Sequence, residues 1–308
     1  MEVRVRNIGK KYGKTQALKG VSFSFAAKQI YGFVGPNGAG KTTTLRILAT
    51  LEEPCSGDAC INGISVTQYP EKIRELVGFM PDALPAHSDI SVHEYLDFFA
   101  RVFRLKGENR RKRIQVVEEF TGLTGIQDRM LKALSKGMKQ RVSLARALVH
   151  DPPVLLMDEP ASGLDPRARV ELRELLKILA RQGKAILISS HILSELTEIC
   201  TGAIIIEHGR ILRTGAISEL TDSDRPSITV LIRTCEEDEN LFRSLLETPC
   251  VSKVNRAGRE LSVEMEGGDK ESSELLASLI KQGHRICEFK PRHTDLEDIF
   301  MRITKGDV

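Results

Sequence analysis

A glycine-rich segment separates a short apolar run from a helical pattern: Gly35-Pro36-Asn37-Gly38-Ala39-Gly40-Lys41-Thr42-Thr43. This strand–loop–helix setting is the one that a phosphate-binding loop requires. Glycines let the backbone fold tightly around a phosphate, and the helix that follows adds the positive end of its dipole. Lys41 supplies a mobile cation for the outer phosphates, and the hydroxyl of Thr42 suits Mg²⁺. The segment predicts that the chain binds a nucleoside triphosphate.

The composition is that of a globular protein without a bias toward nucleic acid or membranes. The chain has 308 residues, enough for one large or two ordinary domains, and its 45 basic residues nearly balance its 42 acidic ones. Apolar runs such as Ala203–Ile206 are far shorter than the ~20 residues of a membrane span. The six cysteines form no Cys-x-x-Cys pair. We therefore expect a cytosolic protein with reduced thiols that does not itself cross a bilayer.

The order of strand and helix patterns predicts an α/β fold. A fully apolar strand pattern at Val154–Asp158 is typical of a buried parallel sheet, and strands alternate with helices from there to Glu207. Short strand patterns at Val3–Arg6 and Val21–Phe25 precede the glycine-rich segment. Apolar side chains at helical spacing over residues 84–150 predict an inserted helical subdomain.

A second, smaller domain is expected near the end of the chain. Residues 221–226 have the polar, proline-containing composition of a linker. Over residues 227–308 the order strand–helix–strand–strand–helix–strand predicts a small ferredoxin-like α+β domain. A last helix is expected at Thr294–Thr304.

Two adjacent carboxylates follow the apolar strand. A nucleoside triphosphatase needs one carboxylate for the metal and one for the attacking water. Asp158 is placed to fix the metal, directly or through water, and Glu159 is placed to orient or deprotonate the water. A pair of helix-capping residues is the alternative, which the preceding phosphate loop disfavours.

Three further features fit a site assembled from two chains, although each also has an ordinary explanation. Ser135 and Gly137 precede a basic helix and can hold a γ-phosphate at its N-terminus, or simply cap it. Asp165 and His191 stand at turns where polar caps are common. Separately from these three, Tyr12 lies in a polar turn before the phosphate loop and is either a surface aromatic or a stacking partner for a base.

In this order the motifs resemble those of the nucleotide-binding subunit of ATP-binding cassette (ABC) transporters, over residues 1 to about 220. The resemblance implies a RecA-like P-loop NTPase core with a mixed sheet and the helical subdomain at about 84–150. It implies ATP and Mg²⁺ as cofactors. Residue by residue, it implies adenine stacking at Tyr12; a Walker A loop at Gly35, Pro36, Asn37, Gly38, Ala39, Gly40, Lys41, Thr42 and Thr43; signature contacts at Ser135 and Gly137; metal binding at Thr42, Asp82 and Asp158; a dimer contact at Asp165; and catalysis by Glu159 and His191 with Lys41.

Two positions depart from the family pattern. The signature usually reads Leu-Ser-Gly-Gly-Gln, whereas Lys136 and Met138 replace a glycine and the glutamine here. Ser135 and Gly137, which carry the phosphate contacts, are kept. Asp82 stands in place of the Q-loop glutamine. A carboxylate can ligate Mg²⁺ but cannot donate a hydrogen bond as an amide does, so water positioning or coupling to the membrane partner is expected to differ.

The resemblance also implies partners. Two such chains would bind two ATP head to tail and drive a separate membrane-spanning permease from the cytoplasmic face of the membrane. Leu134–Arg141, Leu164–Arg169 and Asp295–Phe300 look most like the ABC-2 type, which includes bacterial exporters. The alternative is a soluble ABC ATPase acting on ribosomes or nucleic acid, which usually carries two cassettes, long coiled coils or zinc inserts. A binding module without hydrolysis is disfavoured by intact Asp158, Glu159 and His191.

Overall fold

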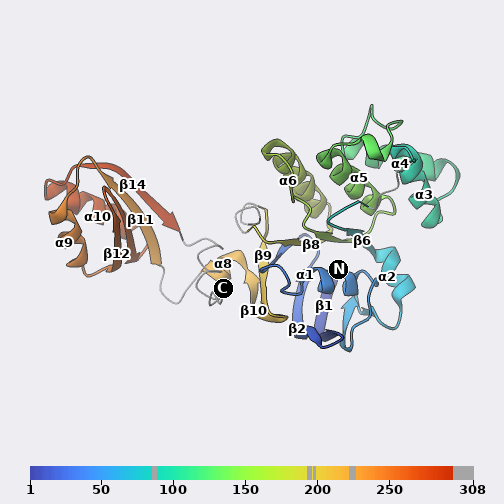
Figure 1. Ribbon diagram of the computed structural model, residues 1–308, viewed down its shortest axis with the longest axis horizontal. Helices are drawn as coiled ribbons and strands as arrows, with labels where there is room; N and C mark the ends of the chain where they lie inside the picture. Colours follow the sequence, from blue (N-terminus) through green and yellow to red (C-terminus); the bar gives the residue numbers. More distant parts are fainter. Residues whose placement is uncertain (85–88, 193–195, 197–198, 222–226, 294–308) are drawn as a thin grey trace. The chain divides into compact units, whose positions relative to one another are not determined.

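The computed structural model of the chain describes residues 1–84, 89–192, 196, 199–221 and 227–293. It divides into two compact units, Met1–Ala216 and Ile217–Val308 (Figure 1). A short helix, α8 (Ile217–Thr221), begins the second unit. Of the predicted linker 221–226, all but the first residue lies outside the described residues, so the domain bounds 1–220 and 227–308 remain predictions.

The central sheet of the first unit has six strands in the order β10-β9-β3-β8-β7-β6. The strand β10 (Arg210–Ala216) is antiparallel to its neighbour, and the other five are parallel to one another: β3 (Ile30–Val34), β6 (Val77–Met80), β7 (Val154–Asp158), β8 (Ala185–Ser190) and β9 (Gly202–Glu207). Every residue of β3, β7 and β8 is buried, as their apolar sequences require. The predicted α/β fold with a mixed sheet is confirmed.

A second, antiparallel sheet has the order β2-β1-β4-β5. Its strands are β1 (Glu2–Tyr12), β2 (Thr15–Ala26), β4 (Ser56–Ile61) and β5 (Ile64–Ser65). The strands predicted at Val3–Arg6 and Val21–Phe25 were therefore too short. The hairpin of β1 and β2 stays paired to its tip, where Tyr12 lies opposite Thr15 and Gly13 turns with a φ of 55°. The assignment of Tyr12 to a polar turn was wrong, because it ends a strand.

Helices cover both faces of the central sheet. Figure 1 shows α1 (Lys41–Leu48) on the side of the antiparallel sheet and α5 (Lys136–Leu148) and α6 (Pro166–Arg181) on the other side. Side chains from both sheets and from α1 form one apolar core. The helix α2 (Pro70–Leu76) leads into β6.

The predicted helical subdomain contains α3 (Val92–Val102), α4 (Gly107–Phe120), the short 3₁₀ helix Leu131–Ala133 and α5. A capping box between Ser91 and Glu94 begins α3. No helix within the described part of the chain is long and apolar enough to cross a membrane.

The basic run that opens α4 makes contacts within the subdomain. Arg110 pairs with Asp97 of α3, the Nε and Oδ1 atoms being 2.7 Å apart. Arg113 donates to the carbonyl oxygens of Leu148 and Val149 at the end of α5. A cation at this position satisfies carbonyl groups that the helix leaves unpaired. Arg110 and Arg113 of this run therefore hold helices of the subdomain together.

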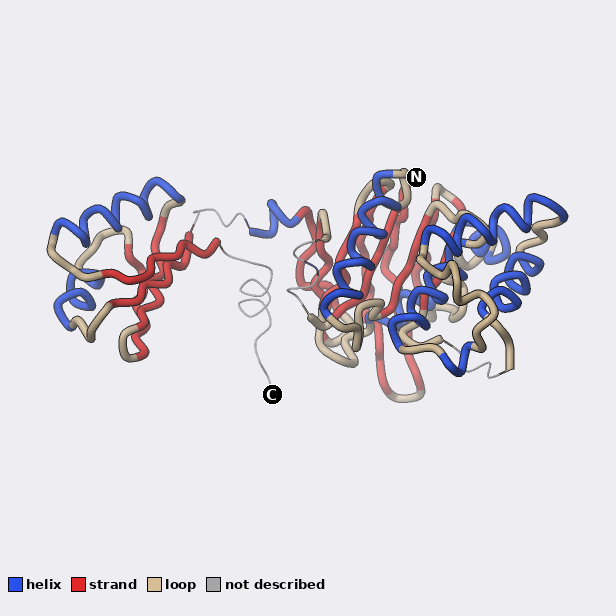
Figure 2. The backbone as a smooth tube through the Cα atoms, turned by 90° about the horizontal axis from the view of Figure 1, so that it is seen from above, coloured by secondary structure: helices blue, strands red, loops and turns tan. Residues whose placement is uncertain are grey.

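The second unit has the order β11 (Ser227–Thr234), α9 (Glu239–Leu246), β12 (Val251–Ala257), β13 (Glu260–Glu266), α10 (Asp269–Lys281) and β14 (Ile286–His293). Its sheet has the order β12-β13-β11-β14, and all neighbours are antiparallel. Figure 2 shows the strands of this unit in red beside its helices in blue. This is the predicted split β-α-β arrangement of a ferredoxin-like domain. Both helices contribute leucines to its own apolar core. The helix predicted at Thr294–Thr304 lies outside the described residues.

A buried histidine follows α5 and couples the subdomain to the sheet. The His150 ring stacks on Phe103, with ring centroids 3.7 Å apart, and its Nε2 donates to the Val77 carbonyl oxygen at 3.1 Å. Its Nδ1 is buried and has no hydrogen-bond partner among the described residues. Burial lowers the pKa of His150 to about 4; Arg113 and Lys184 add to this, and Asp151 and the Val77 carbonyl oppose it.

Acid is expected to destabilise the first unit through His150. In the unfolded chain the His150 imidazole binds a proton near pH 6.5, whereas in the folded chain it stays neutral down to about pH 4. The free energy of unfolding therefore falls as the pH drops through this window. The loss amounts to roughly 3 kcal/mol. Urea unfolding of wild type and His150→Phe between pH 7 and 4 should give a visibly flatter pH profile for the variant. Parallel profiles would contradict this role for the imidazole.

Candidate functional site

The glycine-rich segment forms a tight loop between β3 and α1. Gly40 precedes the helix with a φ of 108°, in the left-handed region. A Cβ atom on Gly35 would lie 2.2 Å from the carbonyl oxygen of Ile206 in β9, so no other residue fits there. The backbone therefore packs against the sheet at one end of the loop and opens the helix at the other.

The ammonium group of Lys41 is folded back over this loop. Its side chain is only 6% exposed, and Nζ donates to the carbonyl oxygens of Gly35 at 2.6 Å and Pro36 at 3.1 Å. Burial lowers the pKa of Lys41, while Glu159 and Asp158 act in the opposite direction. The loop thus holds a partly desolvated cation, a strong partner for phosphate oxygens.

At the end of β7, Asp158 lies beside the start of α1. Its Oδ1 accepts hydrogen bonds from the hydroxyls of Thr42, at 3.1 Å, and Ser189, at 2.6 Å. The Ser189 hydroxyl also accepts from the backbone N–H of Glu159 at 2.9 Å. Ser189 fixes both carboxylate residues. The role of Ser189 was not predicted, because the sequence shows only a hydroxyl near the end of the strand beside β7.

The donor set at this point fits Mg²⁺. Thr42 and Asp158 offer oxygen atoms, which Mg²⁺ prefers, and Mg²⁺ commonly takes one or two carboxylates and completes its shell with water and phosphate oxygens. Among the described residues, no cluster of three or more His, Cys, Asp or Glu side chains offers a cage made of protein alone. The arrangement therefore suits a metal that arrives with phosphates.

Glu159 follows Asp158 in an unusual backbone conformation. Its φ is 48°, in the left-handed region that few residues with a side chain adopt. Its Oε2 lies 2.8 Å from Nδ1 of His191, and its Oε1 lies 3.8 Å from Nζ of Lys41. A residue held in such a conformation commonly belongs to a functional site. The carboxylate is thus positioned from two sides.

These residues border one polar cavity of about 530 Å³. Its wall contains the phosphate loop, both carboxylates and Asp82, which follows β6: Ala17, Asn37, Gly38, Gly40, Lys41, Thr42, Thr43, Arg46, Phe79, Pro81, Asp82, Ala83, Asp158 and Glu159. The Asp82 carbonyl oxygen accepts from Nε2 of Gln140 in α5 at 3.1 Å. The structure therefore joins Lys41, Thr42, Asp82, Asp158 and Glu159 around a space that suits phosphates.

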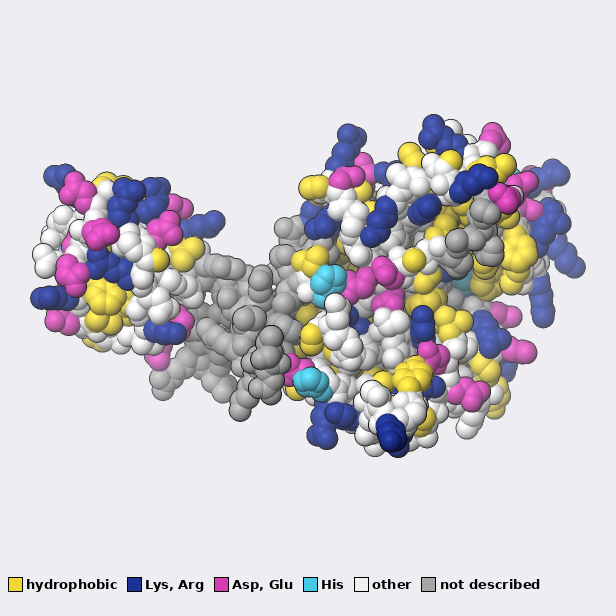
Figure 3. All heavy atoms as spheres, viewed as in Figure 1, with side chains coloured by type: hydrophobic (Ala, Val, Ile, Leu, Met, Phe, Trp, Pro, Cys, Tyr) yellow, Lys and Arg dark blue, Asp and Glu magenta, His cyan; other side chains and the backbone are white. Residues whose placement is uncertain are grey.

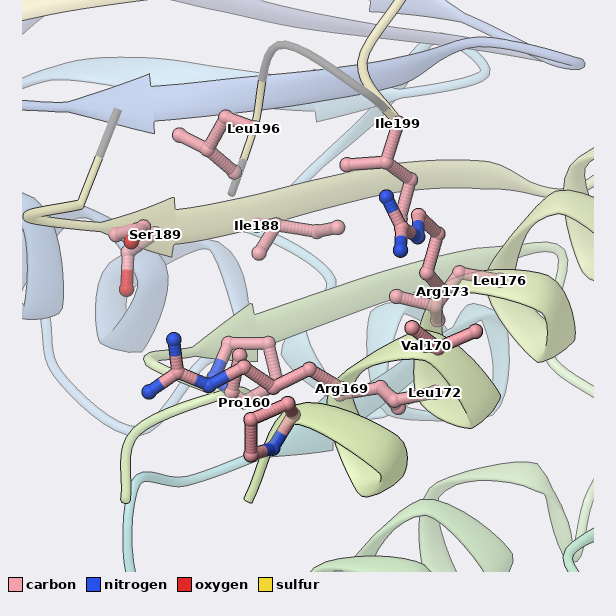
Figure 4. A pocket seen from close by; sticks show the side chains of 13 residues that line it. Pro160, Arg169, Val170, Leu172, Arg173, Leu176, Ile188, Ser189, Leu196 and Ile199 are labelled. Atoms are coloured by element: carbon pink, nitrogen blue, oxygen red, sulfur yellow. The ribbon is translucent and has the colours of Figure 1, made fainter. Parts of the chain in front are cut away.

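A second cavity, of about 330 Å³, lies between α6 and β8. Figure 4 shows its mostly apolar wall, with Val170, Leu176 and Ile188 among the labelled side chains. Ser189 belongs to its wall, and the hydroxyl of that residue is bonded to Asp158 of the polar site. An apolar wall does not suit a triphosphate, so the polar cavity is the candidate nucleotide site.

The remaining predicted site residues do not line this cavity. Ser135 and Asp165 are the N-caps of α5 and α6, where their side chains accept from Met138 N and Ala168 N. Both residues are therefore helix caps, as their ordinary explanation predicts. Ser135 is exposed and Gly137 half-buried, so both remain accessible to another molecule. Within one chain, the signature segment and the phosphate loop stay apart.

Tyr12 is exposed at the tip of the β1–β2 hairpin. Its hydroxyl donates to Glu52, and the Lys10 ammonium lies over its ring, 5.1 Å from the centroid. The ring is 44% exposed, which leaves area for stacking. The structure therefore keeps open the role in base stacking.

Comparison with known proteins finds a matching family model and relatives that match nearly the whole chain. A family model described as "ABC transporter" matches residues 18–162. The Nod factor export ATP-binding protein I of Cupriavidus metallidurans is 35% identical over 98% of this chain and 97% of its own length. The linearmycin resistance ATP-binding protein LnrL of Bacillus subtilis is 28% identical over 98% of both chains.

Solved structures share the fold of the first unit. The cbiO1 protein of Clostridium perfringens, part of the ABC transporter complex cbiONQ, is 28% identical with a TM-score of 0.65, over 71% of this chain and 89% of its own. A dimeric ATP-binding cassette in a post-hydrolysis state, bound to ADP and Pi, is 27% identical with a TM-score of 0.64, over 70% of this chain and 98% of its own.

Proposed function

Because this chain belongs to the ATP-binding, ATP-hydrolysing subunits of the ABC transporter family, we propose that two copies close around Mg-ATP and thereby drive a separate membrane permease. One observation carries the proposal. The polar cavity contains the phosphate loop and both carboxylates, whereas Ser135 and Gly137 lie outside it on an accessible helix start. A second chain, turned head to tail, would bring that helix start to the γ-phosphate.

Residues of the polar cavity, together with Tyr12 and His191, would each have a separate role. Lys41 and the loop N–H groups would bind the β- and γ-phosphates, and Tyr12 would stack on the adenine. Mg²⁺, held by Thr42 and Asp158, would neutralise phosphate charge. Glu159 would accept a proton from the attacking water, and His191 would hold its carboxylate and contact the γ-phosphate. ATP would thus join the two chains, and hydrolysis would remove the preference for the closed state.

Mixing two inactive variants tests whether each site is shared. Lys41→Ala removes the phosphate cation, and Gly137→Asp places a carboxylate where the partner's γ-phosphate would bind. A Cβ atom fits at Gly137, because its nearest neighbours would be 3.7 and 3.9 Å away. An acidic side chain in the first turn of α5 also interacts favourably with the helix dipole. Neither variant alone should form an ATP-dependent dimer on gel filtration, whereas the mixture should, because one of its two sites is intact.

The matched control puts both substitutions in one chain and mixes that chain with wild type. A mixed dimer then has no intact site if the sites are shared, so only wild-type homodimers should appear. If each chain instead forms its own site, the results invert: the first mixture stays inactive and the double variant joins a working dimer.

We further propose that Asp82 contributes an oxygen ligand, directly or through water, to the metal. Its place in the wall of the polar cavity supports this role. Asp82→Asn should raise the Mg²⁺ concentration for half-maximal ATPase activity about tenfold. The same change at the exposed Asp89, which pairs with Lys132, is the control. An unchanged Mg²⁺ requirement in Asp82→Asn would remove this residue from the metal site.

For the permease, we propose docking between the core and the helical subdomain. Figure 3 shows hydrophobic side chains gathered on the surface of that subdomain. Phe98 and Val102 of α3 are each 56% exposed. Exposed apolar side chains in a group favour a protein interface. Such docking would place the chain on the cytoplasmic face of the membrane, and the name of the Nod factor export relative favours export.

A further inference from the structure

Two exposed cysteines lie side by side in the second unit. Cys235 directly follows β11, and Cys287 is the second residue of β14. The two strands are antiparallel neighbours, and the backbone N–H of Cys235 donates to the Arg285 carbonyl oxygen at 3.2 Å. These segments are about fifty residues apart in sequence, so only the folded sheet brings the two thiols together.

An irregularity in the strand pairing brings Cys287 toward Cys235. Arg233 pairs with Glu288 and the next residue, Thr234, pairs with Ile286, so Cys287 is an extra residue in β14. Such a bulge re-aims a side chain. The neighbouring Cys235 thiol is the main cause that raises the pKa of Cys287, and burial adds to it.

We propose that Cys235 and Cys287 are a redox-active dithiol that low-molecular-weight disulfides such as glutathione disulfide convert to an intrachain disulfide. The Cys235 thiolate attacks one sulfur of the glutathione disulfide, which releases a glutathione thiolate and leaves a mixed disulfide. The Cys287 thiolate then attacks the Cys235 sulfur and releases the second glutathione. Both cysteines together lose two electrons, and the glutathione disulfide gains them; the two thiol protons pass to the released thiolates.

The surroundings favour this chemistry. Both cysteines are exposed residues. The Cys235 thiol raises the pKa of Cys287, and the guanidinium groups of Arg233 and Arg259 act in the opposite direction, toward the thiolate. Arg259 also donates to the Cys235 carbonyl oxygen at 3.3 Å. The Cys287 thiol belongs to the same folded chain, so its attack on the mixed disulfide at Cys235 is intramolecular and needs no second collision.

The disulfide would act on an edge strand. In the sheet order β12-β13-β11-β14, the last strand pairs with β11 alone among the residues that the structure describes. Edge strands with a single partner open more readily than central ones. A disulfide between Cys235 and Cys287 would link the first residues of β14 covalently to the end of β11. Oxidation would therefore stabilise the pairing of β11 and β14.

The test equilibrates the full chain with glutathione buffers of increasing oxidised fraction, alkylates the free thiols and maps the peptides. Cys235 and Cys287 should be joined, with a loss of two hydrogen atoms, at a glutathione disulfide concentration at least about tenfold lower than the one that modifies the single exposed thiol of Cys55. Cys287→Ser should give a glutathione adduct on Cys235 instead, and Cys55→Ser should leave the bond unchanged.

Hydrogen exchange supplies a second measurement. Oxidation should slow exchange of the amides of β11 and β14 in wild type and in Cys55→Ser, but not in Cys287→Ser. The proposal is overturned if Cys235 and Cys287 remain free or carry separate adducts at the highest oxidised fraction. It is also overturned if either pairs preferentially with Cys250.

Discussion

Lys41→Ala should weaken binding of Mg-ATP at least about 100-fold. The ammonium is buried over the loop, beside the carbonyl oxygens of Gly35 and Pro36, so phosphate oxygens would meet it in a site with little water. Hydrogen bonds to charged groups of this kind contribute roughly 3 kcal/mol, which corresponds to about two orders of magnitude in Kd. Calorimetric titration with Mg-ATP measures the change directly.

A second cation on the same helix provides the control. Arg46 also borders the polar cavity, but its side chain is 52% exposed and lies 3.4 Å from a carboxylate oxygen of Glu52. Arg46→Ala should therefore change the Kd by only a few-fold, because exposed ion pairs contribute little. Thermal unfolding of both variants verifies that the fold survives. Retention of ATP by a folded Lys41→Ala chain would remove the foundation of the proposed site.

Glu159→Gln should lower kcat for ATP hydrolysis about 10²- to 10⁴-fold, the usual contribution of a general base. The amide keeps the shape of the side chain and its ability to bond His191, but it no longer accepts a proton from water. Binding of Mg-ATP should be retained. The ATP-bound dimer should accumulate on gel filtration because the step that opens it is lost.

The control for this variant is Glu171→Gln on α6, whose carboxylate pairs with Arg141 and Arg167 on the surface. Its turnover should match wild type within about twofold, since surface ion pairs matter little. Normal turnover in Glu159→Gln would instead show that another group serves as the base. Loss of turnover without accumulation of dimer would separate hydrolysis from the proposed closure of two chains.

The parts of the site that lie together in sequence were predictable. The phosphate loop is one contiguous segment between a strand and a helix, so its glycines and Lys41 could be assigned from local pattern alone. Asp158 and Glu159 stand at the end of an apolar strand, and parallel strands bring their carboxyl ends to one edge of the sheet. The ferredoxin-like order of the second unit followed from strand and helix spacing in the same way.

Contacts between distant segments were not predictable. Ser189 meets Asp158 because β7 and β8 pair in a register that sets the last residue of β7 opposite Ser189. A serine near a strand end carries no mark of that pairing. The position of Tyr12 was misjudged because its polar neighbours mask a hairpin that stays paired to the tip. Pairing between strands, rather than local composition, sets such boundaries.

The backbone at Glu159 restricts how descendants of this chain could lose hydrolysis. Amino acids branched at Cβ rarely accept a positive φ, so a change to valine would damage the folded state as well as the chemistry. Changes to aspartate, glycine or glutamine carry no such branching penalty. A lineage that loses hydrolysis but keeps ATP binding would therefore be expected to carry one of those residues at this position. Two of its chains would still be expected to close around ATP as proposed above.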